Sequence, residues 1–138
     1  MKVLILLFVL LTSCSQVSEP AQPEPDFGEL NQNDDFQLKV TVLDQSNLEI
    51  TVINHTSGYI ELQPSDYIHV YEDDKWTNVT SMSMSEGDAG EFIGVKENSS
   101  VNYPLILSEP LSPGHYRYIK TIFPRYQYGS YSVEFDIN

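Results

Sequence analysis

Cysteine is nearly absent from this sequence. The 138 residues contain a single one, Cys14, close to the N-terminus. A disulfide framework within the chain is therefore excluded, and a folded domain has to be held together by its hydrophobic core. The chain beyond Cys14 also offers no thiolate that could act as a nucleophile or bind zinc.

Positive charge is scarce as well. Lys and Arg together number 7 and Asp and Glu number 20, which gives a formal net charge of −13. Nucleic-acid binding needs a basic surface that displaces the counterions of the phosphates, so this composition argues against a nucleic-acid partner. It argues equally against electrostatic attachment to anionic lipid headgroups.

The apolar run at the N-terminus is short. It covers residues 3–11 and follows Lys2. A helix that crosses a bilayer needs about 20 apolar residues, so this run cannot span a membrane. A positive residue followed by a short apolar core is typical of a secretory signal peptide.

The run leads into Leu11-Thr12-Ser13-Cys14, which resembles the lipobox of bacterial lipoproteins. In that family the cysteine receives a diacylglyceryl group, further acyl chains such as palmitate can follow, and the cysteine becomes the new N-terminus. The resemblance implies a signal peptide over residues 1–13 and a lipid anchor at Cys14 on the extracytoplasmic face of a cell membrane. Two acyl chains give stable anchoring where one is marginal. An ordinary signal peptide with a chance cysteine is the alternative.

Residues 14–35 are predicted to be a lipid anchor followed by a tether. Residues 15–35 contain three prolines and several acidic residues, but few apolar ones. A segment of this composition cannot bury a core, so we expect it to stay extended or disordered. The folded domain would then occupy residues 36–138.

From residue 36 onward apolar and polar residues alternate, as they do in strands with one buried face. The alternation is clearest at residues 36–42, 48–52 and 131–137, and no segment after the signal peptide has a helical period. About seven short strands predict an all-β domain, and more specifically a β-sandwich. The other four predicted strands cover residues 59–62, 67–72, 101–107 and 116–123, with residues 64–66 breaking the chain between the first two. Residues 92–95 are a further short candidate, and residues 75–79 follow the turn at residues 73–74.

Three segments of this domain resemble a bacterial immunoglobulin-like domain. Residues 111–117 match the family pattern Leu-x-Pro-Gly-x-Tyr-Arg, and residues 131–137 match its final alternating strand. Residues 75–76 match its Lys-Trp turn, with Asp74 in place of the usual glycine or asparagine. The resemblance covers about residues 36–138. It implies an immunoglobulin-like β-sandwich and a surface location, without implying a catalytic activity or a known ligand.

Tyr116 follows the Pro113-Gly114 turn and is predicted to form a tyrosine corner. In immunoglobulin-like sandwiches, a Tyr at the start of the penultimate strand hydrogen-bonds back to the backbone of the preceding turn. Tyr118 would point into the core as well, at the position where antibody domains carry a cysteine. Simple core packing of both rings is the alternative, and in either case their role is structural.

The sequence contains none of the common catalytic motifs, and we expect neither enzymatic activity nor a cofactor. Patterns for a nucleophile elbow, a zinc protease, a phosphate-binding loop and a calcium loop are missing from it. The histidines are predicted to be ordinary surface residues, with His55 and His115 in turns and His69 on a strand. Acidic clusters at residues 72–74 and 86–91 are interpreted as solvated loops rather than as a calcium site.

Arg125, Tyr126 and Tyr128 are the candidate partner-binding residues, in the loop between the last two predicted strands. Tyr and Arg are enriched at binding hot spots, and loops at this position bind antigen in immunoglobulin variable domains. The alternative is a hairpin whose tyrosines fold back on the sheet. A second candidate is the row of side chains on one face of a predicted strand: Tyr67, His69 and Tyr71.

Together these features predict a lipid-anchored extracytoplasmic protein that presents a non-enzymatic immunoglobulin-like interaction domain. Its partner would be a protein or another component of the cell envelope. Two alternatives stay open. One is a structural accessory subunit of an envelope complex without a ligand of its own, and the other is a small hydrolase or metal-dependent enzyme.

Overall fold

The computed structural model describes residues 27, 30, 34–79, 92–124 and 129–138. These residues form strands joined by turns, which confirms the prediction of an all-β domain. The described residues contain no helix that could span a bilayer. The strands are β1 (Phe36–Val42), β2 (Asn47–Asn54), β3 (Ile60–Glu72), β4 (Lys75–Asn78), β5 (Ile93–Val95), β6 (Ser99–Ile106), β7 (Gly114–Pro124) and β8 (Gly129–Ile137).

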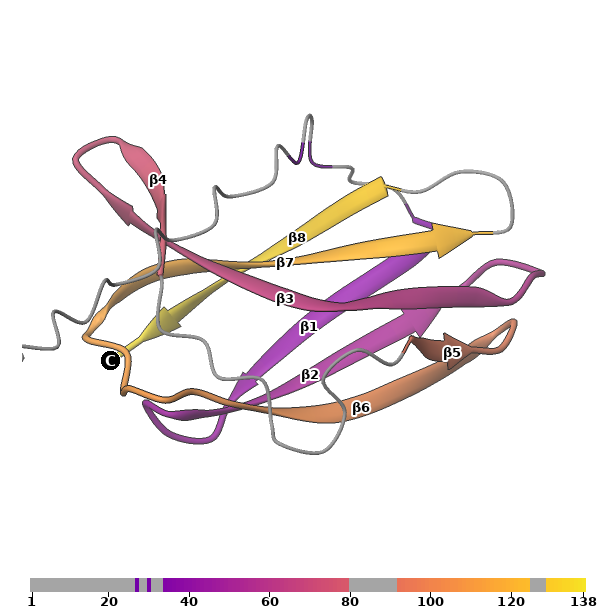
Figure 1. Cartoon of the computed structure of the whole chain (residues 1–138), viewed down its shortest axis with the longest axis horizontal. Coiled ribbons are helices and arrows are strands. Elements are labelled where there is room, and N and C mark those ends of the chain that lie inside the picture. Colours follow the sequence, from indigo (N-terminus) through magenta and orange to yellow (C-terminus); the bar gives the residue numbers. More distant parts are fainter. Residues whose placement is uncertain (1–26, 28–29, 31–33, 80–91, 125–128) are drawn as a thin grey trace, which may run out of the picture.

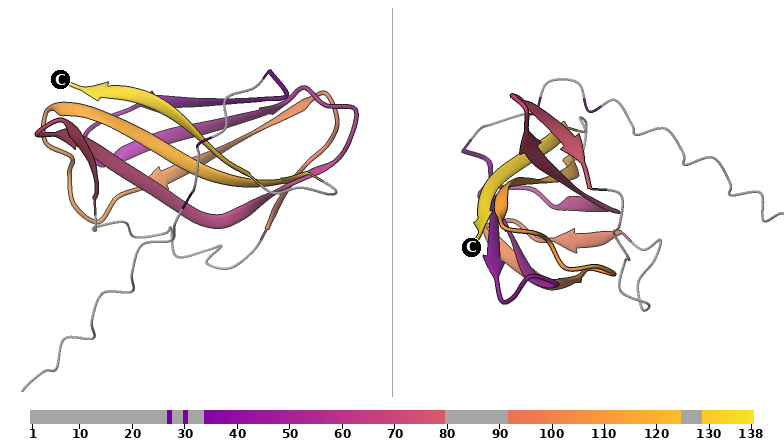
Figure 2. Two further views of the ribbon diagram at one scale, coloured as in Figure 1. Left: turned by 90° about the horizontal axis from the view of Figure 1, so that it is seen from above. Right: turned by 90° about the vertical axis from the view of Figure 1, so that its left-hand side faces the viewer.

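The strands form two sheets that face each other as the layers of a sandwich (Figure 1). The smaller sheet has the order β1-β2-β6, and the larger one has the order β4-β3-β7-β8. Strand β5 pairs with the beginning of β3, while β4 pairs with its end. All pairings are antiparallel, and Figure 2 shows the two layers from the side and from the end.

The core lies between the sheets because alternate residues of each strand face inward. Strand β2 shows this most regularly, since Leu48, Ile50 and Val52 are fully buried while their neighbours are partly exposed. The rings of Phe36 on β1 and Tyr131 on β8 meet at 5.1 Å and link the two sheets along one side. Removal of these apolar side chains from water is the main favourable term in the folding of such a domain.

Strand β3 differs from the sequence prediction. Two strands separated by a break at residues 64–66 were predicted, but β3 is continuous from Ile60 to Glu72. Its pairing with β7 shifts between Leu62 and Asp66, so the irregular stretch around Pro64 is a bulge and not a break. A bulge accommodates the proline because this residue cannot donate a hydrogen bond to the ladder.

Candidate interaction surface

The outer face of the larger sheet carries the second row of candidate residues. Tyr67, His69 and Tyr71 lie on this face of β3, while Ile68 and Val70 belong to the core side, as the alternation predicted. The antiparallel register extends the outer face over the neighbouring strands. Its further members are Trp76 on β4, His115, Arg117 and Ile119 on β7, and Glu134 and Asp136 on β8.

Three aromatic rings meet at one end of this face. The β3–β4 hairpin places Trp76 directly opposite Tyr71, and the two ring centroids are 5.1 Å apart. His115 on β7 completes the group at 5.6 Å from Trp76 and 6.4 Å from Tyr71. Tyr71 remains 42% exposed. We call these three rings, together with Arg117, the outer platform.

Arg117 connects the outer platform to the middle of the face. Its guanidinium carbon lies 4.6 Å from the centre of the Trp76 ring, which is a cation–π arrangement. The same guanidinium donates from Nη2 and Nε to Nδ1 of His69, at 2.8 and 3.1 Å. Nδ1 is the acceptor of both bonds, because a guanidinium group can only donate. The side chain of Arg117 is therefore held in one position by two neighbours.

Two carboxylates hold the imidazole of His115. Its Nδ1 lies 2.7 Å from Asp136 and its Nε2 lies 3.0 Å from Glu134. The hydrogen bond with Asp136, followed by the one with Glu134, raises the pKa of His115 above its ordinary value. The side chain of His115 is 39% exposed and those of Glu134 and Asp136 are 61% and 67% exposed, so solvent screens this group.

The prediction of ordinary surface histidines is wrong for His69, which is 5% exposed. The ring of Phe27, from the segment predicted to be a tether, lies edge-on to Tyr67 at 4.8 Å and to His69 at 6.0 Å. Phe27 and Arg117 thus both approach the His69 ring. His115 lies within β7 and not in a turn.

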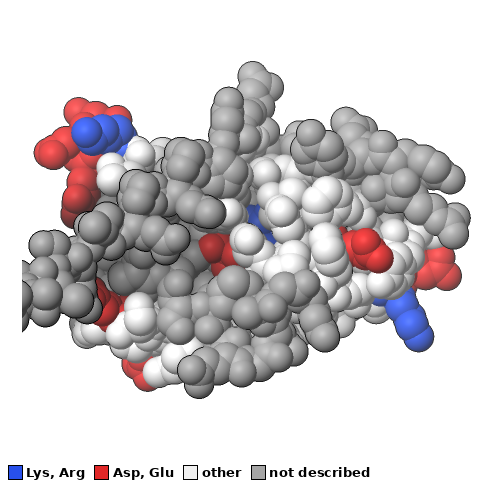
Figure 3. Space-filling model, viewed as in Figure 1, with Lys and Arg blue, Asp and Glu red and all other residues white. Residues whose placement is uncertain are grey.

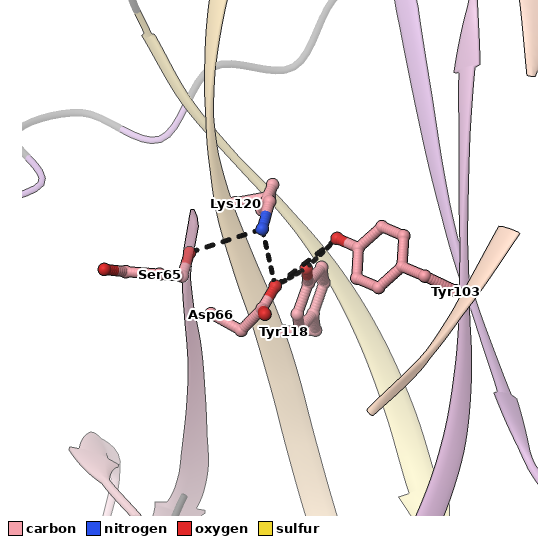
Figure 4. Close-up of polar contacts among 5 residues, drawn as sticks. All are labelled: Ser65, Asp66, Tyr103, Tyr118 and Lys120. Carbon is pink, nitrogen blue, oxygen red and sulfur yellow. Dashed lines mark hydrogen bonds and ion pairs between the residues drawn. The ribbon is translucent and has the colours of Figure 1, made fainter. Parts of the chain in front are cut away.

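The inner faces of β3 and β7 carry a second polar group, which Figure 4 shows. Oδ1 of Asp66 accepts hydrogen bonds from the hydroxyls of Tyr118 and Tyr103 and pairs with Nζ of Lys120 at 2.8 Å. The two hydroxyls are 2.7 Å apart, and Nζ also approaches the carbonyl oxygen of Ser65 at 3.5 Å. We call these five residues the inner cluster. It joins the sheets because Tyr103 comes from β6 and the others come from β3 and β7.

Burial governs the protonation of the inner cluster. The side chains of Lys120 and Asp66 are 1% and 9% exposed. Desolvation, followed by the charge of Asp66, raises the pKa of Tyr103 and of Tyr118 well above the ordinary value, so both stay protonated donors. Desolvation lowers the pKa of Lys120 while Asp66 opposes this effect. The group is a buried ion pair whose anion also receives two hydroxyl donors.

Tyr116 lies where a tyrosine corner requires it. The residue is 4% exposed, and its hydroxyl donates to the carbonyl oxygen of Ser112 at 2.7 Å. Its ring stacks on Phe135 of β8, with the ring centroids 5.6 Å apart. The contribution of this hydrogen bond to stability stays a prediction.

The other predicted site residues lie outside the described residues. These are Cys14, Arg125, Tyr126 and Tyr128. The strand end that leads into the loop of residues 125–128 carries Phe123, whose ring meets that of Phe92 at 5.9 Å. Phe92 is 56% exposed, and Tyr59, 49% exposed, lies over the neighbouring Gly94, where any side chain would collide with the Tyr59 hydroxyl. Exposed aromatic residues therefore occur at this end as well.

The acidic cluster at residues 72–74 forms the exposed turn between β3 and β4. Asp73 and Asp74 have φ values of 51° and 60°, as the two central residues of a tight hairpin require. In Figure 3, which has the same view as Figure 1, acidic and basic side chains gather at the corner where the β3–β4 hairpin lies. Among the described residues, no three His, Cys, Asp or Glu side chains form a group that could hold a metal ion.

Sequence reasoning missed Asp66 and Lys120. Lys120 offered a signal, because it continues the inward-facing series of Tyr116 and Tyr118, where a charged residue requires a buried partner. Asp66 offered none, because it follows the proline that was interpreted as a strand break. Phe27 was a lone aromatic residue in a polar segment, and its position alone could not indicate a contact with β3.

Comparison with known proteins identifies the family. Residues 31–136 match the model of the bacterial Ig-like domain. No curated protein matches the chain.

Two solved structures are similar at low identity, both from Sulfolobus acidocaldarius. The archaellum periplasmic stator protein FlaG is 18% identical with a TM-score of 0.44, and the match covers 71% of this chain and 99% of FlaG. A chain of the complex of the archaellum periplasmic stator proteins FlaF and FlaG is 15% identical with a TM-score of 0.48, covering 80% of this chain and 99% of that one. The assignment rests on the family model, which spans most of the sequence and both sheets. The chain belongs to the family of bacterial immunoglobulin-like domains.

Proposed function

We propose that this protein is a lipid-anchored extracytoplasmic lipoprotein whose immunoglobulin-like domain binds a protein partner, without catalysing a reaction. The observation that carries the binding proposal is the outer platform, where Tyr71, Trp76 and His115 share an accessible patch with Arg117. The types of these residues fit this role, because Trp, Tyr and Arg are the side chains most enriched at binding hot spots.

Rigidity supports the use of this surface. The three rings rest on one another, and Arg117 is held between Trp76 and His69, so little side-chain freedom remains to be lost on binding. Loss of such freedom is one of the costs that reduce the affinity of a protein interface. A patch already ordered before the encounter avoids much of that cost.

Charge indicates the sign of the partner. The chain carries a net charge of −13, and Glu134 and Asp136 border the outer platform as exposed carboxylates. A cationic partner would be steered toward such a surface, with an association rate that falls as salt rises.

Site-specific photocrosslinking in intact cells tests the binding proposal. A photoreactive amino acid at Tyr71 should give a discrete adduct with one partner, and Trp76→Ala should remove that adduct without a large change in melting temperature. The matched control is Thr41, an exposed residue on β1 of the other sheet. Equal labelling from both positions, or none from Tyr71, would contradict binding at the outer platform.

The lipid anchor is proposed from Leu11-Thr12-Ser13-Cys14. Cys14→Ser should release the protein from membranes or leave it unprocessed, as fractionation and intact-mass measurement would show. A Cys14→Ser protein that still fractionates with membranes as an acylated species of mature size would refute the assignment.

The loop with Arg125, Tyr126 and Tyr128 is proposed as the second binding location, at the end of the sheet that carries Phe92 and Phe123. Replacing its three residues together with Ala distinguishes binding from packing. If the triple alanine variant no longer captures the partner that is crosslinked from Tyr71, and its melting temperature is unchanged, the loop takes part in binding as well. Retained capture with a lowered melting temperature would make the loop structural.

A further inference from the structure

Part of the outer face is as inaccessible to water as the core. Ile119 is fully buried and His69 is 5% exposed, although both lie on the outward side of the sheet. Ile119 does not belong to the core cluster between the sheets. A residue in such a position is covered from outside the sandwich.

Phe27 lies at this covered region. Its ring meets Tyr67 at 4.8 Å with an interplanar angle of 70° and His69 at 6.0 Å with an angle of 62°. Both are edge-to-face arrangements, the geometry that aromatic pairs prefer. The rings of Tyr67 and His69 thus both contact the ring of Phe27, which comes from a segment that precedes β1, and we call the position between these two rings the Tyr67–His69 slot.

We propose that the Tyr67–His69 slot is a docking site for an aromatic side chain. Phe27 occupies the slot in the free chain. A partner that bears an aromatic side chain binds this part of the outer face by displacing Phe27. The inference rests on the proposed use of the outer face for binding. It adds that the partner contributes an aromatic side chain and that Phe27 of the same chain competes with this side chain for the slot.

A continuous line of contacts joins the slot to the outer platform. Phe27 touches His69, His69 accepts two hydrogen bonds from Arg117, and Arg117 lies on the Trp76 ring. A change at the slot therefore alters the surroundings of Trp76. Because Trp76 is the single tryptophan of the chain, its fluorescence reports on this change without an added label.

A peptide titration tests the slot without knowledge of the partner. The peptide covers residues 22–35, and a control peptide carries Phe27→Ala. Both are added to the purified chain and to its Phe27→Ala variant, while the resonances of Tyr67 and His69 and the emission of Trp76 are followed. A tethered segment competes at an effective concentration of about a millimolar, so for a peptide Kd of about 0.25 mM the Phe27→Ala variant should bind the wild-type peptide about fivefold more tightly than the wild-type chain does.

Two further variants make the outcomes decisive. Phe92→Ala removes an exposed aromatic residue away from the slot and should leave peptide binding as weak as in the wild-type chain. Adding Tyr67→Ala to the Phe27→Ala chain should abolish binding. Equal affinity of the wild-type and Phe27→Ala chains, or equal binding of the two peptides, would overturn the proposal. Photocrosslinking at Tyr71 is independent of this titration, so failure of the slot and failure of the outer platform are distinguishable.

Discussion

The inner and outer faces of β3 and β7 carry similar side chains in opposite surroundings. On the inner face Lys120 pairs with Asp66 among tyrosine hydroxyls, and its side chain is 1% exposed. On the outer face Arg117 lies between Trp76 and His69, next to a tyrosine that is 42% exposed. Because successive side chains of β3 and β7 point to opposite faces, the two strands place a cation and aromatic rings both in the core and on the outer face.

The difference between the two groups lies in what their removal leaves behind. A buried carboxylate that loses its cation keeps its full desolvation cost, whereas a partly exposed group can return to water. The inner cluster should therefore dominate stability, and the outer platform should dominate recognition. Substitutions on the two faces of the sheet test this division.

Lys120→Met should destabilise the domain most. Methionine keeps the length of the side chain but leaves the Asp66 carboxylate buried without its cation, at a cost of about 3–5 kcal/mol. The double variant Lys120→Met with Asp66→Leu should recover most of that loss, because no charge remains buried. Denaturant titration measures both, and a loss below about 1 kcal/mol for Lys120→Met would show that water reaches the pair.

Tyr116→Ala should cost about 3 kcal/mol, because it removes a buried ring that stacks on Phe135. Tyr116→Phe keeps the ring and loses only the hydrogen bond to the carbonyl oxygen of Ser112, at about 0.5–1.5 kcal/mol. Unfolding curves of the two variants separate packing from hydrogen bonding. An Ala variant as stable as the wild type would rule out a structural tyrosine corner.

Alkaline pH should weaken the inner cluster. The pKa values of Tyr103 and Tyr118 are raised in the folded state, so their contribution is fully present below about pH 10 and is lost as the pH rises further. Each tyrosine should lower the free energy of unfolding by about 1.4 kcal/mol per pH unit. The lowered pKa of Lys120 opposes this up to about pH 10.5, so the slope is best measured above that value.

Tyr118→Phe should remove the contribution of one tyrosine from the decrease of the unfolding free energy with pH. The matched control is Tyr71→Phe, a change on the exposed face of the same sheet. Urea titrations at a series of pH values give the slopes. An unaltered slope in Tyr118→Phe would argue against a Tyr118 hydroxyl that stays protonated in the folded protein.

Arg117→Lys should cost about 1 kcal/mol or less. Lysine keeps the charge but loses the planar group that stacks on Trp76 and donates twice to His69. The emission of Trp76 should shift at the same time. A variant with unchanged stability and unchanged emission would show that the arrangement is not populated in solution.

The smallest effect concerns His115. Its raised pKa means that the protonated ring contributes stability fully below about pH 6.5, and that this contribution fades as the pH rises through the higher folded value. Melting temperatures between pH 5 and 9 should therefore converge for wild type and His115→Gln at the alkaline end. Parallel curves would show that Asp136 and Glu134 do not favour the charged ring.

The sequence predicted the sandwich because its alternation is regular where the core is regular. Residues 36–42 and 131–137 lie in β1 and β8, and the inward positions of Tyr116 and Tyr118 are as expected. Prediction failed at β3, where a proline within a bulge resembles a break. A local pattern records which residues alternate but not how a strand resumes after an irregularity.

The outer face was only partly predictable for a related reason. The row of Tyr67, His69 and Tyr71 follows from alternation alone, but its burial depends on partners far away in the sequence. Phe27 and Arg117 are 42 and 48 residues from His69, and no local rule connects them. Contacts of this range depend on the assembled sheet.

The position of Phe27 also bears on how far the domain can stand from the membrane. If the lipid is on Cys14 and Phe27 stays in its slot, the tether consists of residues 15–26 and reaches about 45 Å when fully stretched. A tether that ended at residue 35 would reach about 75 Å. Since the slot and the outer platform share one face, a lipid at Cys14 together with docked Phe27 would keep that face within about 45 Å of the bilayer and within reach of membrane-bound neighbours.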